Sequence, residues 1–204
     1  MQLIPHEINQ NNNFIDAWTI QDESVSDNLI KFFELNYQWQ KDGRVGTGEI
    51  KKDVKASRDI NIGIGNGLED EAVQNYLNAL TQVTEEYKKK YTWSNDAMGH
   101  WGITEDFNVQ RYLPGEGFFE WHCERGSERS IRRHLTFMTY LNDITDGGET
   151  EFYYQKLKIK PKKGLTVIWG TDWTFTHRGL TSPTQTKYII TGWYSFIRPV
   201  EIEG

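Results

Sequence analysis

The sequence has a single cysteine, five prolines and no long apolar run among its 204 residues. One cysteine excludes an internal disulfide framework and fits a reducing compartment. No segment approaches the roughly 20 apolar residues that a membrane-spanning helix needs. The first residues also lack the charged and apolar regions of a signal peptide. We therefore expect a soluble, cytoplasmic protein without a membrane partner.

Positive charge is also scarce. Lys and Arg total 23 against 29 Asp and Glu, and the net charge of −6 gives no electrostatic reason to expect a nucleic-acid partner. Mean hydropathy is low, at −0.70, but 14% aromatic residues, including eight Trp, argue against disorder. A chain of this length is most simply one domain with a sizeable core. The pattern does not indicate an oligomeric state.

Two segments predict helices. The first begins at Ser24, with Asp27 in a box-like arrangement, and its apolar positions recur at helical spacing: Val25, Leu29, Ile30, Phe33 and Tyr37. The second spans 69–91, where acidic residues at the start and Lys88 to Lys90 at the end match the helix macrodipole. Its buried stripe is expected at Val73, Leu77, Leu80 and Val83 or Thr84.

Short segments between turn residues predict strands. They are 14–20, 59–64, 109–112, 121–124, 134–141, 151–154, 165–169, 175–177 and 187–196. Many short strands with Gly and Pro turns are typical of a β-sandwich or barrel. For the charged segment 51–59, a solvated strand edge is favoured over a border of the pocket. Loop 125–132, rich in Arg and Ser, fits substrate recognition and plain solvation equally well.

His122 and Glu124 are two residues apart. In an extended strand both side chains project from one face, and Cys123 points away as a small core residue. With His177 as the third ligand, two imidazoles and a carboxylate make a facial triad that leaves positions open on non-haem iron. Zinc hydrolases use the same ligand types, so the set does not name the metal. The motif alone also fits ordinary polar histidines.

Further motifs follow in order between Asn108 and Phe196. They are Tyr112-Leu113-Pro114-Gly115 ahead of His122, the pattern R-x-x-T-x-x-x-Y-L-N from Arg133 through Thr136 and Tyr140, the turn Gly147-Gly148-Glu149-Thr150, Pro161 with Gly164, and Lys187 and Trp193 after His177. This stretch, a little under half of the chain, resembles the 2-oxoglutarate- and Fe(II)-dependent oxygenases of the prolyl 4-hydroxylase type. The family usually has Asp in place of Glu124, whose longer side chain must fold back to reach a metal.

The resemblance implies a mainly β fold with flanking helices (α+β), in which a double-stranded β-helix, or jelly roll, carries the N-terminal helices on one sheet. Residues 1–204 would form a single domain, with 1–106 supporting a core at 107–198. It also implies site residues. The metal ligands would be His122, Glu124 and His177. Lys187 would bind 2-oxoglutarate together with Tyr140, Thr191, Trp193 and, as a further candidate, Tyr112. Arg133 would face the substrate.

Strand parity tests these implied roles. Lys187, Thr191 and Trp193 share one face of the strand that begins at Lys187, so the cofactor groups would lie together. Arg133 falls on the face opposite Thr136 and Tyr140 unless the chain bulges there.

The implied activity is a 2-oxoglutarate- and Fe(II)-dependent dioxygenase that uses O2, releases succinate and hydroxylates a prolyl or other peptidyl residue, with ascorbate as a candidate reductant. A peptide or protein substrate is preferred, and a small molecule or free amino acid is the alternative. Two other classes stay open. One is a non-catalytic jelly-roll binding protein, with Glu124 as the sign of lost turnover. The other is a zinc hydrolase, which requires a general base near the metal. That interpretation gives no role to the segment from Lys187 to Trp193.

Overall fold

Two antiparallel sheets form the body of the computed structural model, which describes residues 3–6, 8, 13–63, 65–96 and 99–197. The major sheet has the order β1-β2-β11-β8-β13-β6-β4-β3, with β5 added beside β13, and the minor sheet has the order β10-β9-β12-β7. The strands are β1 (Leu3–His6), β2 (Asp16–Ile20), β3 (Lys41–Asp42), β4 (Arg58–Ile62), β5 (Trp101–Gly102), β6 (Phe107–Tyr112), β7 (Phe118–His122), β8 (Arg133–Tyr140), β9 (Thr150–Phe152), β10 (Leu157–Ile159), β11 (Leu165–Gly170), β12 (His177–Gly179) and β13 (Lys187–Phe196).

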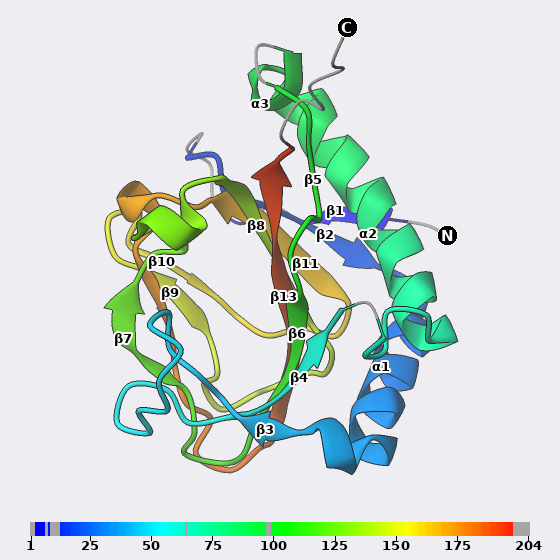
Figure 1. The fold of residues 1–204 in the computed structure, drawn as a ribbon, viewed down its shortest axis with the longest axis vertical. Helices are drawn as coiled ribbons and strands as arrows, with labels where there is room; N and C mark the ends of the chain where they lie inside the picture. Colours follow the sequence, from blue (N-terminus) through cyan, green and yellow to red (C-terminus); the bar gives the residue numbers. More distant parts are fainter. Residues whose placement is uncertain (1–2, 7, 9–12, 64, 97–98, 198–204) are drawn as a thin grey trace, which may run out of the picture.

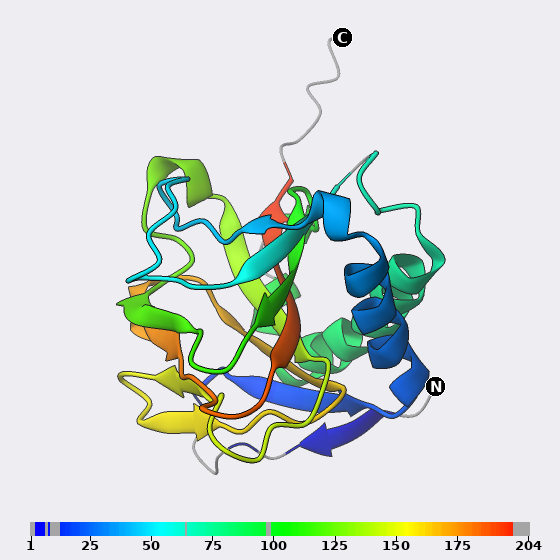
Figure 2. The same ribbon diagram turned by 90° about the horizontal axis from the view of Figure 1, so that it is seen from below.

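The two long helices, α1 (Glu23–Leu35) and α2 (Glu71–Lys90), cover the outer face of the major sheet, and the minor sheet lies on its other side (Figures 1 and 2). The short helices are α3 (Trp93–Asp96), η1 (Tyr37–Trp39), η2 (Glu128–Ser130) and η3 (Trp173–Phe175). One apolar cluster joins helices to sheet, and a second fills the space between the sheets. This arrangement confirms the expected jelly roll with N-terminal helices packed on one sheet.

The start of α1 differs from the expectation. Asp22, not Ser24, is the N-cap, and its carboxylate accepts a hydrogen bond from the Ser24 backbone N–H at 3.0 Å. Asp27 forms no capping box and instead pairs with Lys163 at 2.8 Å. Tyr37 is 76% exposed because the helix has ended before it. Phe32 joins the buried stripe in its place.

Helix α2 follows its predicted pattern closely. Asp70 caps it by accepting from the Ala72 backbone N–H at 2.9 Å. The predicted stripe is buried at Val73, Leu80, Val83 and Thr84, whereas Leu77 is only partly buried. The helix has 20 residues, but neither it nor any other helix in the described part of the chain is both long and apolar enough to cross a membrane.

Several strand boundaries differ from the prediction. Strands β1, β3, β5 and β10 were not expected, β7 ends before Glu124, and β12 begins at His177 because Phe175 belongs to η3. Strand β4 covers most of 59–64, and Ile64 lies outside the described residues. The solvated-edge interpretation of 51–59 is wrong at Lys55, which is 4% exposed and pairs with Asp59 at 2.7 Å.

The faces of β13 and β8 follow strand parity with one interruption. Ile189 joins the cluster between the sheets, whereas Ile190 and Tyr194 face the helices. In the pairing of β13 with β8, Tyr194 lies opposite Leu135, but Ser195 lies opposite Arg133. One extra residue on β8 therefore makes a bulge. The bulge turns Arg133 toward the same interior that Trp193 faces.

Phe33 tests how much the helical layer contributes to stability. It is 0% exposed, and its ring meets the Tyr188 ring edge-on at 5.9 Å. Replacing Phe33 by alanine is expected to lower the free energy of unfolding by roughly 3–5 kcal/mol, from lost burial and the cavity left behind. Urea denaturation measures this. Leu35, 65% exposed on the same helix, is the control, and Leu35→Ala should change stability by less than about 0.5 kcal/mol.

Candidate metal centre

His122 and His177 lie directly opposite each other where β7 and β12 pair, and their ring centroids are 4.4 Å apart. Each Nδ1 meets a backbone carbonyl oxygen, of Glu120 at 3.0 Å for His122 and of Phe175 at 2.8 Å for His177. A carbonyl only accepts, so each Nδ1 carries the hydrogen. Each Nε2 then keeps a lone pair for a metal ion, as in most metal-binding histidines.

Glu124 lies two residues beyond the end of β7, in a bend, so the predicted strand does not continue through it. Its backbone N–H donates to the Thr171 carbonyl oxygen at 3.0 Å. Its Oε1 is nonetheless 3.3 Å from Nε2 of His177 and 3.7 Å from Nε2 of His122. Neighbouring ligands about 2.1 Å from one metal ion lie about 3 Å apart. The bend thus compensates for the longer side chain of glutamate. Cys123, the residue between His122 and Glu124, is half-buried, so the prediction of a core residue is wrong there.

Burial and mutual charge set the protonation of this group. Burial lowers the pKa of His122 to about 4, and the charge of His177 adds to the effect. Burial alone would raise the pKa of Glu124, but the contact with His177, the charge that either imidazole carries when protonated, and Arg133 lower it to about 2. The candidate ligand atoms of the three residues all lie within 4.8 Å of one another.

Because the pKa of His122 is depressed in the folded protein, the free energy of unfolding should decrease as the pH falls from about 6.5 toward 4.

Aromatic rings enclose the two imidazoles. The Phe118 ring stacks on His122 with centroids 3.6 Å apart and planes 11° apart. Phe152 and Trp169 pack against His177 at centroid distances of 5.5 and 5.2 Å. Sequence reasoning missed Phe118, although it stands four residues before His122 on the same face of β7 and parity identifies it.

Lys187 is a buried cation, 4% exposed, at the start of β13. Its Nζ donates to the carbonyl oxygens of Gly148 at 3.0 Å and Leu180 at 3.2 Å, and lies 5.0 Å from the Tyr112 ring centroid. No carboxylate of the described residues pairs with it. Burial lowers the pKa of Lys187 to about 8, only partly offset by the charge of Glu149. One of its three N–H donors remains for an anionic ligand.

The other predicted cofactor residues also lie between the sheets. The Tyr140 hydroxyl is fully buried and donates to Oγ1 of Thr150 at 2.6 Å. The Tyr112 hydroxyl donates to Oε1 of Gln110 at 2.7 Å. Thr191 uses its hydroxyl on the Phe137 carbonyl oxygen at 3.0 Å. The structure therefore brings Tyr112 beside Lys187, while the hydroxyl groups of these residues already have protein partners.

Arg133 reaches Glu124 of the candidate metal centre despite its sequence parity. Its guanidinium makes bonds to both carboxylate oxygens of Glu105, the shortest at 2.7 Å, and donates to the backbone carbonyl of Glu124 at 3.0 Å. It also lies 3.4 Å from the centroid of the Trp193 ring. Contact of Arg133 with a substrate stays a prediction. Sequence reasoning missed Glu105, and its position in a connector gave no signal.

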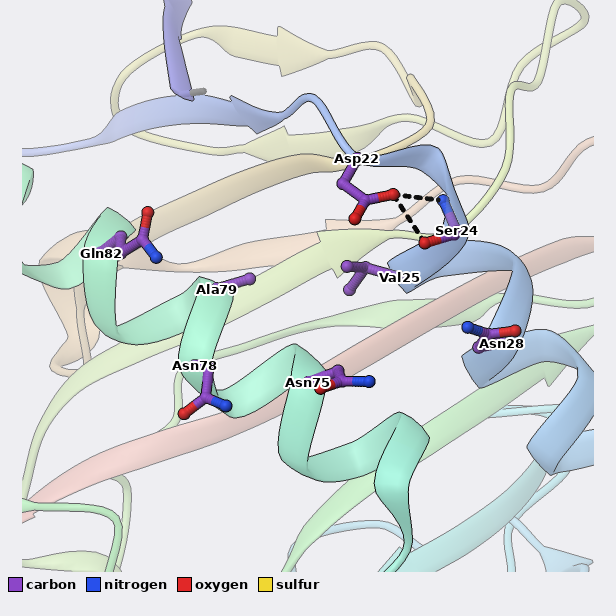
Figure 3. A pocket seen from close by; sticks show the side chains of 8 residues that line it. All are labelled: Asp22, Ser24, Val25, Asn28, Asn75, Asn78, Ala79 and Gln82. Atoms are coloured by element: carbon purple, nitrogen blue, oxygen red, sulfur yellow. Dashed lines mark hydrogen bonds between the residues drawn. The ribbon is translucent and has the colours of Figure 1, made fainter. Parts of the chain in front are cut away.

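A polar groove of about 270 Å³ lies elsewhere, between α1 and α2 on the helical layer. Figure 3 shows side chains from both helices lining it. Its one carboxylate, Asp22, is already used to cap α1. The groove therefore has no evident part in the chemistry of the candidate metal centre.

Two histidines on the minor sheet and the carboxylate of Glu124 just past β7 form a candidate facial-triad metal site in a jelly roll, and the major sheet supplies a buried lysine. Residues 107–195 match the model of the 2OG-Fe(II) oxygenase superfamily, which confirms the resemblance found in this part of the sequence. A protein of Acanthamoeba polyphaga mimivirus, named "Putative prolyl 4-hydroxylase", is 36% identical over 73 residues. The match covers 31% of this chain and 30% of that relative's length.

Solved structures share the fold over almost the whole chain. A Pseudomonas putida prolyl-4-hydroxylase has a TM-score of 0.68 at 16% identity, covering 92% of this chain and 95% of its own. The viral collagen prolyl hydroxylase of Paramecium Bursaria Chlorella virus-1, in its 2OG complex, has a TM-score of 0.64 at 22% identity, covering 91% and 98%. A Trichoplax adhaerens prolyl hydroxylase, bound to a hypoxia inducible factor peptide fragment, has a TM-score of 0.68 at 20% identity, covering 91% and 84%.

The residues present fit the Fe(II) and 2-oxoglutarate that the superfamily name specifies. The triad offers one carboxylate oxygen and two imidazole nitrogens at ligand spacing. The buried ammonium of Lys187 suits the distal carboxylate of 2-oxoglutarate, which would need a positive partner between the two sheets. On the major sheet, Nε1 of Trp169 (β11) and Oγ1 of Thr136 (β8) are buried without a hydrogen-bond partner among the described residues.

Proposed function

We propose that this protein is a 2-oxoglutarate- and Fe(II)-dependent dioxygenase that hydroxylates a prolyl or other peptidyl residue. The observation that carries the proposal is the pairing of the triad with the buried Lys187, which has no carboxylate partner among the described residues. When bound, iron and 2-oxoglutarate would supply the oxidising chemistry, with O2 consumed and 2-oxoglutarate decarboxylated to succinate and carbon dioxide. Ascorbate would serve only to restore the reduced metal.

Each residue has a role that follows from its surroundings. His122, Glu124 and His177 would hold the metal from one side, and the backbone carbonyls that bind each Nδ1–H fix both imidazoles in the ligating tautomer. Lys187 would hold the distal carboxylate of 2-oxoglutarate. Tyr112 would lie beside that carboxylate, since its ring is already 5.0 Å from Nζ.

The remaining predicted residues shape the pocket. Tyr140, Thr191 and Trp193 would line the space between Lys187 and the metal, because they face the interior from β8 and β13. The rings around His122 and His177 exclude water and so strengthen the electrostatic contacts within.

A peptide substrate is favoured over a small molecule by the relatives. The Trichoplax adhaerens protein is described in complex with a peptide fragment, and the viral protein is named a collagen prolyl hydroxylase. We therefore propose a peptide or protein substrate for this chain as well, in a soluble cytoplasmic setting.

The test is direct. The purified protein receives Fe(II) and 2-oxoglutarate without oxygen, and the visible charge-transfer band of the chelate is sought. Proline-containing peptides and free amino acids are then screened in air for succinate release and the mass gain of one oxygen atom. A band with peptide hydroxylation supports the proposal. A band with hydroxylation of free amino acids alone moves the substrate to small molecules. No band leaves a jelly-roll binding protein.

A further inference from the structure

The two carboxylate oxygens of Glu124 have different surroundings. Oε1 faces Nε2 of His177 at 3.3 Å and Nε2 of His122 at 3.7 Å. Oε2 points away from them and accepts a hydrogen bond from Nε1 of Trp193 at 2.8 Å. It also lies 3.8 Å from Nη1 of Arg133. One oxygen is therefore presented to the imidazoles, and the other is already bound by the protein.

The indole that binds Oε2 is itself fixed. The guanidinium of Arg133 stacks on the Trp193 ring at 3.4 Å from its centroid. Glu105 holds that guanidinium through Nε at 3.1 Å and Nη2 at 2.7 Å, and Ser195 donates to Glu105 at 2.9 Å. These contacts run without a gap from the connector before β6 to the side chain of Glu124.

The same guanidinium controls the Glu124 backbone. Nη1 of Arg133 donates to the Glu124 carbonyl oxygen at 3.0 Å. This contact depends on the bulge in β8, because regular pairing would send the Arg133 side chain toward the helices. Arg133 thus contacts the main chain of Glu124 directly, and it acts on the carboxylate both through the 3.8 Å ion pair with Oε2 and through Trp193.

We infer that Glu105, Arg133 and Trp193 are positioning residues that orient Glu124, so that it offers a metal ion Oε1 alone. This inference rests on the proposed metal site, and it gives Arg133 a role other than substrate contact. The physical need comes from the extra methylene of glutamate. A free glutamate arm has one more rotatable bond than aspartate, and its ordering costs entropy. Held by Oε2, the carboxylate leaves the remaining metal positions open.

The first experiment uses the metal-free protein. The indole N–H signal of Trp193 in ¹H–¹⁵N spectra is identified by its loss in Trp193→Phe. The signal is expected to shift in Glu124→Gln and in Glu105→Gln. Glu34→Gln is the matched control, because Glu34 pairs with Arg111, which lies over the Phe33 ring on the outer face. An indole signal that Glu124→Gln leaves unmoved overturns the inference.

The second experiment measures Co²⁺ affinity and geometry. Trp193→Phe keeps a ring for Arg133 but loses the donor, and the Kd for Co²⁺ should rise on the order of tenfold for one charge-assisted hydrogen bond. Glu105→Gln should raise the Kd several-fold. The infrared carboxylate bands of Glu124, isolated by subtracting the Glu124→Gln spectrum, should show the wide splitting of a single-oxygen ligand. The matched controls are Trp101→Phe and Glu34→Gln, which should bind Co²⁺ as the parent does.

The outcomes separate the two proposals. If the parent binds Co²⁺ and both Trp193→Phe and Glu105→Gln bind it equally well, the positioning role is wrong and the metal site stands. Narrow, two-oxygen splitting of the Glu124 bands also overturns the inference. If the parent binds no Co²⁺, the proposed metal site fails, and the indole signal alone decides whether these residues orient the carboxylate.

Discussion

Replacing His177 by alanine is expected to abolish stoichiometric Fe(II) binding and to lower 2-oxoglutarate turnover by more than the roughly 100-fold that loss of an outer-shell partner can cost. His177 is 5% exposed and is the proposed ligand nearest to Glu124, with Nε2 3.3 Å from Oε1. Without it, the metal would keep one imidazole and one carboxylate from the proposed triad. Anaerobic titration with Fe(II) and succinate release in air measure the two effects.

The control for this variant is His100→Ala, which removes an exposed imidazole from the connector before β5. It should bind Fe(II) as the parent does. Because His177 also packs against Phe152 and Trp169, a thermal melt of each variant must show that the fold persists. A folded His177→Ala protein that binds Fe(II) at parental affinity would rule out His177 as a ligand.

Strand parity explains which parts of this site the sequence could predict. The period of a strand is fixed at two residues, so Lys187, Thr191 and Trp193 had to share a face once β13 was identified. The order of the motifs then gave the family resemblance, and that resemblance implied the jelly roll. Neither step required knowledge of how the strands pair.

Pairing and local bends are what the sequence did not reveal. The opposition of His122 and His177 depends on the register of β7 with β12, which side-chain type does not encode. The bulge that turns Arg133 inward and the bend at Glu124 carry no Gly or Pro at those residues. Backbone carbonyls also have no sequence signal, so the contacts of Lys187 with Gly148 and Leu180 were invisible until the chain was folded.

The solvated interpretation of segment 51–59 failed at one residue for a similar reason. Lys55 looks like its exposed neighbours Lys51 and Lys52 in the sequence. In the fold, an isolated backbone β-bridge joins Lys55 to Phe118, and the Lys55 side chain is buried beside Asp59. A long-range contact therefore overrode the local charge pattern.

Replacing Lys187 by methionine is expected to weaken 2-oxoglutarate binding by about 100-fold, the effect of removing one partner from a buried, hydrogen-bonded charge pair. Methionine keeps most of the volume of the stem, so the cavity cost is small. Lys187→Arg keeps the charge and should lose less. Lys89→Met, which removes a lysine with a 70% exposed side chain on α2, is the control. The measurement is the concentration of 2-oxoglutarate that half-saturates the anaerobic charge-transfer band, and equal values for Lys187→Met and the parent would assign the co-substrate to another cation.

The pH dependence of the same binding step tests the charge itself. Burial lowers the pKa of Lys187 to about 8 in the ligand-free protein, a shift that costs the charged form about 3 kcal/mol. A bound carboxylate favours the ammonium and raises that pKa. Between the two values, binding must take up a proton, so the dissociation constant of 2-oxoglutarate should stay flat below pH 8 and rise about tenfold for each unit above it. In Lys187→Met this rise should disappear, because no ammonium remains to titrate. A parental rise that survives the substitution would place the titrating group elsewhere in the pocket.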